Sequence, residues 1–151
     1  MRTYLAVIDD SAEARVALRF AARRAARTAG AVALLAFVPP AEFVQWVSVQ
    51  AAMEEEERLR VEAMVADVAG ALFAELGIHP EIVIRTGEPI DEVAAVLKAR
   101  PDIDALVLGA RAHGGPGELV AHFTGIGAGQ LPCPVMVIPG GLDDAALDRL
   151  S

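Results

Sequence analysis

Short, uninterrupted apolar runs alternate with longer helical stretches along this sequence, and this alternation constrains the fold more than any other feature. Consecutive apolar residues are typical of strands that are buried on both faces of a sheet. Four runs have the length and composition of such strands, and they cover residues 4–8, 31–38, 105–108 and 135–138. Residues 81–85 alternate instead, which predicts a further strand nearer a sheet edge. Because helical stretches separate the strands, the pattern predicts an α/β fold with a parallel sheet and helices on both faces.

Local signals mark the ends of the first two helices. Ser11 is a suitable N-cap for a first helix that ends at Gly30. Residues 41–49 lack clear periodicity. By contrast, apolar residues recur at helical spacing over residues 50–76, which predicts one long helix closed by Gly77.

The second half of the chain continues the alternation with shorter helices. Pro89 suits the first turn of a third helix that runs to about Ala99. A further helix is expected from Glu118, and it should be short or distorted because three glycines follow within residues 125–129. We therefore expect one domain over residues 1–140 and a tail, 141–151, that adds a short surface helix or frays.

Composition and charge limit the class of protein. A chain of 151 residues with 54% hydrophobic residues suits one compact domain. Its formal charge of −8 disfavours non-specific binding to nucleic acids or anionic membranes. The start of the sequence lacks a signal-peptide pattern, and no apolar run reaches the roughly 18 residues of a spanning helix. With a single cysteine, Cys133, a cytoplasmic protein is expected.

Two loops of the predicted sheet are candidates for a ligand site. In open α/β sheets, ligands bind beyond the carboxyl ends of the strands, where the strand order reverses. A flavodoxin-like order would bring Asp9, Asp10 and Ser11 towards the glycine-rich loop 109–117. Adjacent residues of an extended chain point apart, so only one of the two aspartates should face the site. The glycines could form a phosphate cradle or ordinary tight turns, and their spacing leaves both interpretations open.

Other polar residues have simpler explanations. Arginines at positions 15, 19, 23 and 27 form one stripe on the first helix, which indicates a solvated face, with a docking surface for an acidic partner as the alternative. The three histidines are too scattered in sequence to define a metal site. A reactive Cys133 would need a nearby cation or helix N-terminus, which the sequence does not establish.

Four separated motifs resemble the universal stress protein family in their order and spacing. They span residues 7–11 (Val-Ile-Asp-Asp-Ser), 87–89 (Gly-Glu-Pro), 106–111 (Leu-Val-Leu-Gly-Ala-Arg) and 132–138 (Pro-Cys-Pro-Val-Met-Val-Ile). The resemblance covers nearly the whole chain, although Asp10 stands where the family usually has glycine. It implies a doubly wound, Rossmann-like sheet of the adenine nucleotide alpha hydrolase type, with five parallel strands in the order 3-2-1-4-5.

The resemblance also implies binding residues and a partner. If a nucleotide site is retained, its residues would be Asp9, Phe37, Val38, Gly109, Gly114, Gly115, Ala121 and His122. Of these, Asp9, Phe37 and Val38 would lie near adenine and ribose, and the three glycines near the phosphates. The family often forms homodimers through its last strand, here Val135, Met136, Val137 and Ile138.

The phosphate-binding motif of the family is incomplete in this sequence. Family members that bind ATP carry Gly, two residues, Gly, nine residues, then Gly followed by Ser or Thr. Gly109 matches the first position, but Ala112 replaces the second glycine, and Ala121 and His122 stand in place of the final pair. The stretch is also one residue short, so the motif indicates a degraded nucleotide site.

These observations predict a small stress-response or regulatory module that acts through contacts with an unidentified protein partner. One alternative is a switch protein of the same family that binds ATP with Mg²⁺. The bound nucleotide would change the population of the conformation that can bind a partner. A slow ATP hydrolase is the third interpretation, for which the sequence offers no catalytic residue set and no metal motif.

Overall fold

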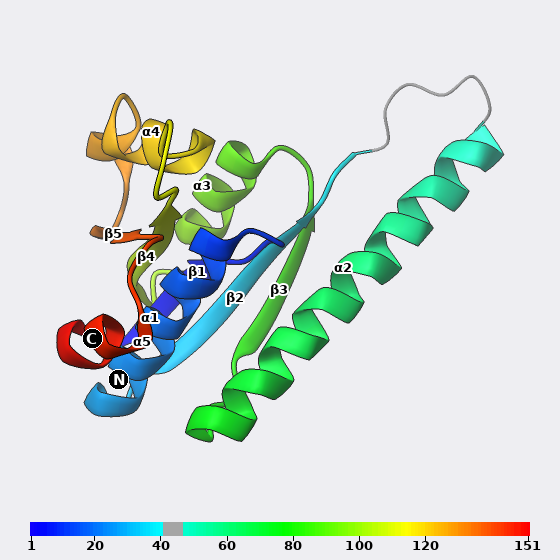
Figure 1. The fold of residues 1–151 in the computed structure, drawn as a ribbon. Coiled ribbons are helices and arrows are strands. Elements are labelled where there is room, and N and C mark those ends of the chain that lie inside the picture. The colour runs from blue at the N-terminus through cyan, green and yellow to red at the C-terminus, as the bar shows by residue number, and fades with distance from the viewer. Residues whose placement is uncertain (41–46) are drawn as a thin grey trace.

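Five parallel strands form one sheet in a computed structural model that describes residues 1–40 and 47–151 (Figure 1). The elements in chain order are β1 (Thr3–Val7), α1 (Ala12–Thr28), β2 (Ala31–Val38), α2 (Val47–Leu76), β3 (Glu81–Thr86), α3 (Pro89–Ala99), β4 (Ile103–Ala110), α4 (Glu118–Thr124), the short 3₁₀ helix η1 (Ala128–Gln130), β5 (Val135–Pro139) and α5 (Asp144–Leu150). The strand order β3-β2-β1-β4-β5 confirms the predicted sheet. Part of the stretch 41–49, predicted to lack periodicity, lies outside the described residues.

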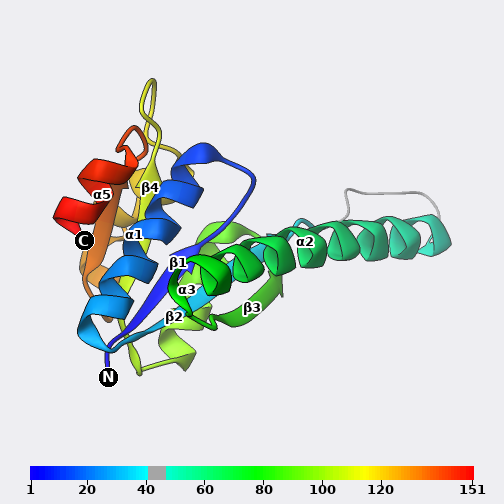
Figure 2. The same cartoon turned by 60° about the horizontal axis from the view of Figure 1, so that its bottom comes forward.

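Helices cover both faces of the sheet (Figures 1 and 2). One core cluster joins α1 and α2 to one face, and it includes Leu18, Phe20 and Val65. A second cluster joins α3 and α4 to the other face through Val93, Leu97, Phe123 and their neighbours. The central strand β1 is buried along its whole length, which explains its continuous apolar sequence. The first part of α2 extends beyond the sheet in both views.

The first helix begins as predicted and extends to Thr28, but the residue that closes it differs from the expected one. The Ala14 amide donates a hydrogen bond of 3.2 Å to the Ser11 hydroxyl, so Ser11 is the N-cap. At the other end, Ala29 adopts the left-handed conformation (φ 52°) that was expected of Gly30. Gly30 is needed for a different reason, because a Cβ there would lie 2.5 Å from the carbonyl oxygen of Arg2.

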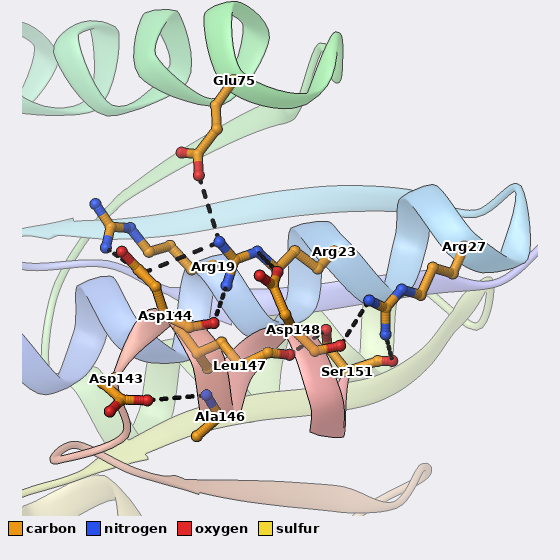
Figure 3. A network of polar contacts seen from close by, with 10 residues as sticks. All are labelled: Arg19, Arg23, Arg27, Glu75, Asp143, Asp144, Ala146, Leu147, Asp148 and Ser151. Atoms are coloured by element: carbon orange, nitrogen blue, oxygen red, sulfur yellow. Dashed lines mark hydrogen bonds and ion pairs between the residues drawn. The ribbon is translucent and has the colours of Figure 1, made fainter.

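The tail forms a short helix, α5, that lies against α1 (Figure 3). Asp143 caps α5 by accepting a hydrogen bond of 2.9 Å from the Ala146 amide, and Leu147 is buried in the core between the two helices. The burial of Leu147 therefore holds α5 against α1.

Three arginines of the α1 stripe make polar contacts with this helix, although Arg15, Arg19 and Arg27 stay exposed, as expected of a solvated face (Figure 3). Arg19 pairs with Asp144 at 3.1 Å. Arg23, whose side chain is only 12% exposed, pairs with Asp148 at 3.3 Å and with Glu75 of α2 at 3.6 Å. Arg27 donates hydrogen bonds to the backbone carbonyl oxygens of Asp148 and Ser151. The acidic surface that the stripe binds thus belongs to the same chain.

Candidate functional site

A cleft of about 230 Å³ lies at the carboxyl ends of β1 and β4. These strands are neighbours, and the segments that follow them lead to helices on opposite faces of the sheet, so the cleft occupies the topological switch point. Its floor and walls are apolar, with Val7, Phe37, Pro89, Leu108 and Pro116 among the lining residues. The polar lining comes from Asp9, Ser11, Glu13, Arg111 and Glu118.

Three of the eight predicted nucleotide-site residues line this cleft. Asp9, Phe37 and Gly109 come from the ends of three different strands and meet there. The other five lie elsewhere in the structure: Val38 is buried in the core on the α1 and α2 face, Gly114 and Gly115 lie in the exposed loop before α4, Ala121 is exposed on α4, and His122 lines a separate cavity. The nucleotide-binding role of these residues stays a prediction.

The two adjacent aspartates point apart, as their spacing predicts. A carboxylate oxygen of Asp9 accepts a hydrogen bond of 2.8 Å from the Ser11 amide, and the side chain lines the cleft. Asp10 instead pairs with Arg60 of α2 at 3.2 Å. Only Asp9 is therefore positioned to act on a ligand in the cleft.

Gly109 has a packing role that does not depend on any ligand. A Cβ at this position would overlap the carbonyl oxygen of Glu13, in the first turn of α1. Gly140 is similarly close to the same region, since its Cβ would lie 2.6 Å from the carbonyl oxygen of Ala110. The backbones of β4, α1 and the end of β5 therefore approach one another too closely for any side chain, which explains glycine at both positions.

The charges in the cleft are predominantly negative. Among the residues that the structure describes, three carboxylates line it, from Asp9, Glu13 and Glu118, against the single guanidinium of Arg111. Arg111 already lies 3.7 Å from a carboxylate oxygen of Glu13. A ligand with several phosphate groups would meet net repulsion here, because like charges at short range in a partly enclosed site oppose binding.

Arg111 and Gly117 belong to the loop 109–117 that the sequence placed at the site, whereas sequence reasoning missed the two carboxylates of Glu13 and Glu118. Gly117 has a φ of 101°, a conformation that favours glycine, and it is the N-cap residue of α4. Positions directly after β4 and at the start of the next helix carried the available signal. The directions of their side chains, however, depend on the path of the loop 111–117. Its glycines allow several backbone conformations, so the sequence does not predict that path.

Cys133 lacks the surroundings of a reactive thiol. Burial raises the pKa of this thiol, and the carboxylate of Asp104 raises it further, whereas a backbone hydrogen bond from Leu106 acts in the opposite direction. A raised pKa lowers the thiolate fraction at neutral pH, and the thiolate is the nucleophile. Cys133 instead packs against the second core cluster, two residues before β5.

Over residues 1–40 and 47–151, no group of three or more His, Cys, Asp or Glu side chains is arranged to hold a metal ion. Within the same described ranges, none of the helices combines the length and the apolar character that crossing a membrane requires.

The sheet order and the cleft at the reversal of that order define a doubly wound α/β protein of the Rossmann-like class. Residues 1–139 match the model of the universal stress protein family, and the chain belongs to that family. Among curated protein sequences, none matches this chain.

Solved structures of universal stress proteins share the fold at low sequence identity. The universal stress protein UspA from Lactobacillus plantarum aligns with a TM-score of 0.75 and 20% identity, over 91% of this chain and 97% of its own. A universal stress protein in complex with cAMP aligns with a TM-score of 0.55 and 18% identity, over 91% and 96%. A family protein from Arabidopsis thaliana with AMP bound gives 0.55 and 18%, over 92% of each chain.

Proposed function

We propose that this chain is a regulatory, stress-response module that acts through protein contacts as a homodimer and whose strand-end cleft no longer holds ATP. The observation that carries the proposal is the charge of the cleft, where Asp9, Glu13 and Glu118 line the same space as the guanidinium of Arg111. ATP at neutral pH carries several negative charges on its phosphates, so each carboxylate in the cleft opposes its binding. The departures at Ala112, Ala121 and His122 from the family's phosphate-binding pattern support the same conclusion.

Calorimetric titration of the nucleotide-stripped protein with ATP and Mg²⁺ tests this proposal. The wild-type chain should give no saturable heat up to millimolar ATP. Glu118→Gln removes one carboxylate from the cleft rim without changing its size, so it should strengthen ATP binding by roughly threefold to tenfold. Glu62→Gln is the matched control, because Glu62 is exposed on α2 and does not line the cleft.

Either of two results would contradict the proposal. Micromolar ATP binding by the wild-type chain would mean that the cleft accepts the phosphates despite its charge. Equal increases of ATP affinity in Glu118→Gln and Glu62→Gln would mean that the net charge of the protein, and not the charge of the cleft, controls ATP binding.

The second candidate is a switch that binds an adenine nucleotide with fewer phosphates. The AMP and cAMP complexes among the similar structures favour it, because those ligands carry one phosphate each. Phe37 offers an aromatic surface for a base, and Arg111 offers one cation for one phosphate. Titration with AMP and cAMP in the same calorimeter distinguishes this switch from the nucleotide-free module, and saturable binding of AMP without ATP binding would favour the switch.

The homodimer of the proposal forms through β5, which is an edge strand of the sheet. Val135 and Met136 are half-buried and Val137 is 38% exposed, so pairing with a second copy would cover apolar side chains. The unpaired backbone groups on the outer side of an edge strand also provide a template for a second strand. A chain that stays monomeric at tens of micromolar would remove this part of the proposal.

The proposed cellular setting is the cytoplasm, and the proposed macromolecular partner is a protein. A net charge of −8 opposes nucleic acids and anionic lipid surfaces, which leaves protein surfaces as the favoured contacts.

A further inference from the structure

A second cavity lies away from the strand-end cleft, on the face of the sheet that α3 and α4 cover. It measures about 390 Å³, which falls within the range of roughly 300–1,000 Å³ typical of small-molecule sites. Leu97 and Phe123, only 1% and 2% exposed, belong both to its lining and to the core beneath. Leu131, Pro101 and Pro132 add further apolar walls.

One wall of this cavity is fixed by the turn after α4. The carbonyl oxygen of His122 accepts hydrogen bonds from the amides of Gly125 and Gly127, at 3.2 and 2.9 Å. A Cβ at residue 127 would lie 2.5 Å from Nε2 of His122, so the absence of a side chain at Gly127 leaves room for the imidazole. The imidazole also lies edge-on to Phe123, with ring centroids 4.9 Å apart. The aromatic wall is therefore formed before any ligand binds.

The rim carries positive and hydrogen-bonding groups. Lys98, the only lysine in the sequence, is exposed on α3 and lines the cavity. His122 and Gln130 line it as well, whereas no carboxylate of the described residues does.

We propose that this cavity, defined by Leu97, Lys98, His122, Phe123 and Leu131, binds a small apolar acid: an aromatic or alicyclic body with one carboxylate. The body packs between Leu97, Phe123 and Leu131, and the carboxylate pairs with the ammonium group of Lys98 at the rim. This charge preference is the reverse of that in the strand-end cleft, where carboxylates outnumber the guanidinium of Arg111. The two sites therefore select different ligands, and the second site does not depend on the proposed loss of ATP binding.

Titration with 2-naphthoate, followed by amide NMR spectra of the full chain, tests the proposal. The signals of residues 94–98 and 122–131 should shift and saturate at submillimolar ligand. Ala94→Phe fills the cavity from α3 and should weaken binding by about tenfold or more. Ala95→Phe places the same side chain on the same helix, at an exposed position outside the cavity, and should change affinity by less than about twofold.

The role of Lys98 is tested with a neutral probe of the same shape. Wild-type protein should bind 2-naphthoate about twofold to fivefold more tightly than 2-naphthamide, since an exposed ion pair contributes little. Lys98→Ala should abolish that preference while retaining the amide's affinity. Because Lys98 is exposed, this variant keeps the test valid even if Ala94→Phe misfolds.

Three outcomes would overturn the proposal. The first is a lack of saturable shifts at several millimolar 2-naphthoate, and the second is a set of shifts centred on Asp9 and Gly117 in the other cleft. The third is a change of the signals of residues 94–98, on α3, with protein concentration alone, because it would identify a second copy of the chain as the occupant of the cavity.

Discussion

At the scale of single residues, Gly109 can be tested for whether glycine is needed there for packing or for binding a ligand. A side chain here would overlap the Glu13 carbonyl, and both backbones belong to rigid elements that cannot move apart cheaply. Gly109→Ala should therefore lower the free energy of unfolding by about 1–3 kcal/mol or more. Chemical denaturation without nucleotide measures this change.

Gly115→Ala provides the matched control for that measurement. Gly115 lies in the same connection, a Cβ added there would have no neighbour within 4 Å, and its φ is not positive. Its substitution should change stability by less than about 0.5 kcal/mol. Equal stability of both variants and the wild type would show that the contact with Glu13 relaxes freely, and Gly109 would then need a ligand to explain it.

Residue identities in the site were only partly predictable from the sequence. Asp9, Phe37 and Gly109 could be placed because each lies at the carboxyl end of a strand, where the fold itself determines position. His122 could not, because α4 begins after a loop with several glycines and its orientation decides which cavity the imidazole faces. Similarly, Val38 is one residue from Phe37, and the alternation of side chains along β2 turns it to the opposite face of the sheet.

At the scale of elements, α5 is held on α1 mainly through Leu147 and the arginine network. Arg23 is the best-shielded member and connects α1 with both α2 and α5 (Figure 3). Arg23→Ala should lower the free energy of unfolding by about 1 kcal/mol, because the partly exposed carboxylates of Glu75, Asp144 and Asp148 lose a shared partner. The loss should shrink at high salt, which screens exposed pairs.

Arg15→Ala is the control in the same stripe. Arg15 is exposed on α1, one turn before Arg19. We expect a change of less than about 0.5 kcal/mol. Thermal or urea unfolding of the two variants at low and high salt checks both values, and an equal loss in both would contradict a specific role for the network.

The strands and most helix ends followed from the sequence because they depend on local chemistry. Continuous apolar runs, the Ser11 cap and Pro89 at a helix start each act within a few residues. The partner of the arginine stripe did not follow, since Arg19 and Asp144 lie 125 residues apart and only the folded chain brings them together. Local patterns identify charged faces, and tertiary structure determines what covers them.

At the scale of the whole molecule, the fold presents two cavities of opposite charge preference and two sheet edges, β3 and β5. The acidic strand-end cleft lies at the switch point, the second cavity lies between α3 and α4, and β5 is the edge through which we propose assembly. This arrangement supports a module in which protein contacts are retained after nucleotide binding has been lost.

Native mass spectrometry of the chain, purified without added nucleotide, tests this account most directly because it reports assembly and bound nucleotide together. We expect the mass of two chains and no mass added by an adenine nucleotide. A species with one ATP per chain would contradict the central claim that the cleft has lost ATP binding, and a monomer would contradict assembly through β5.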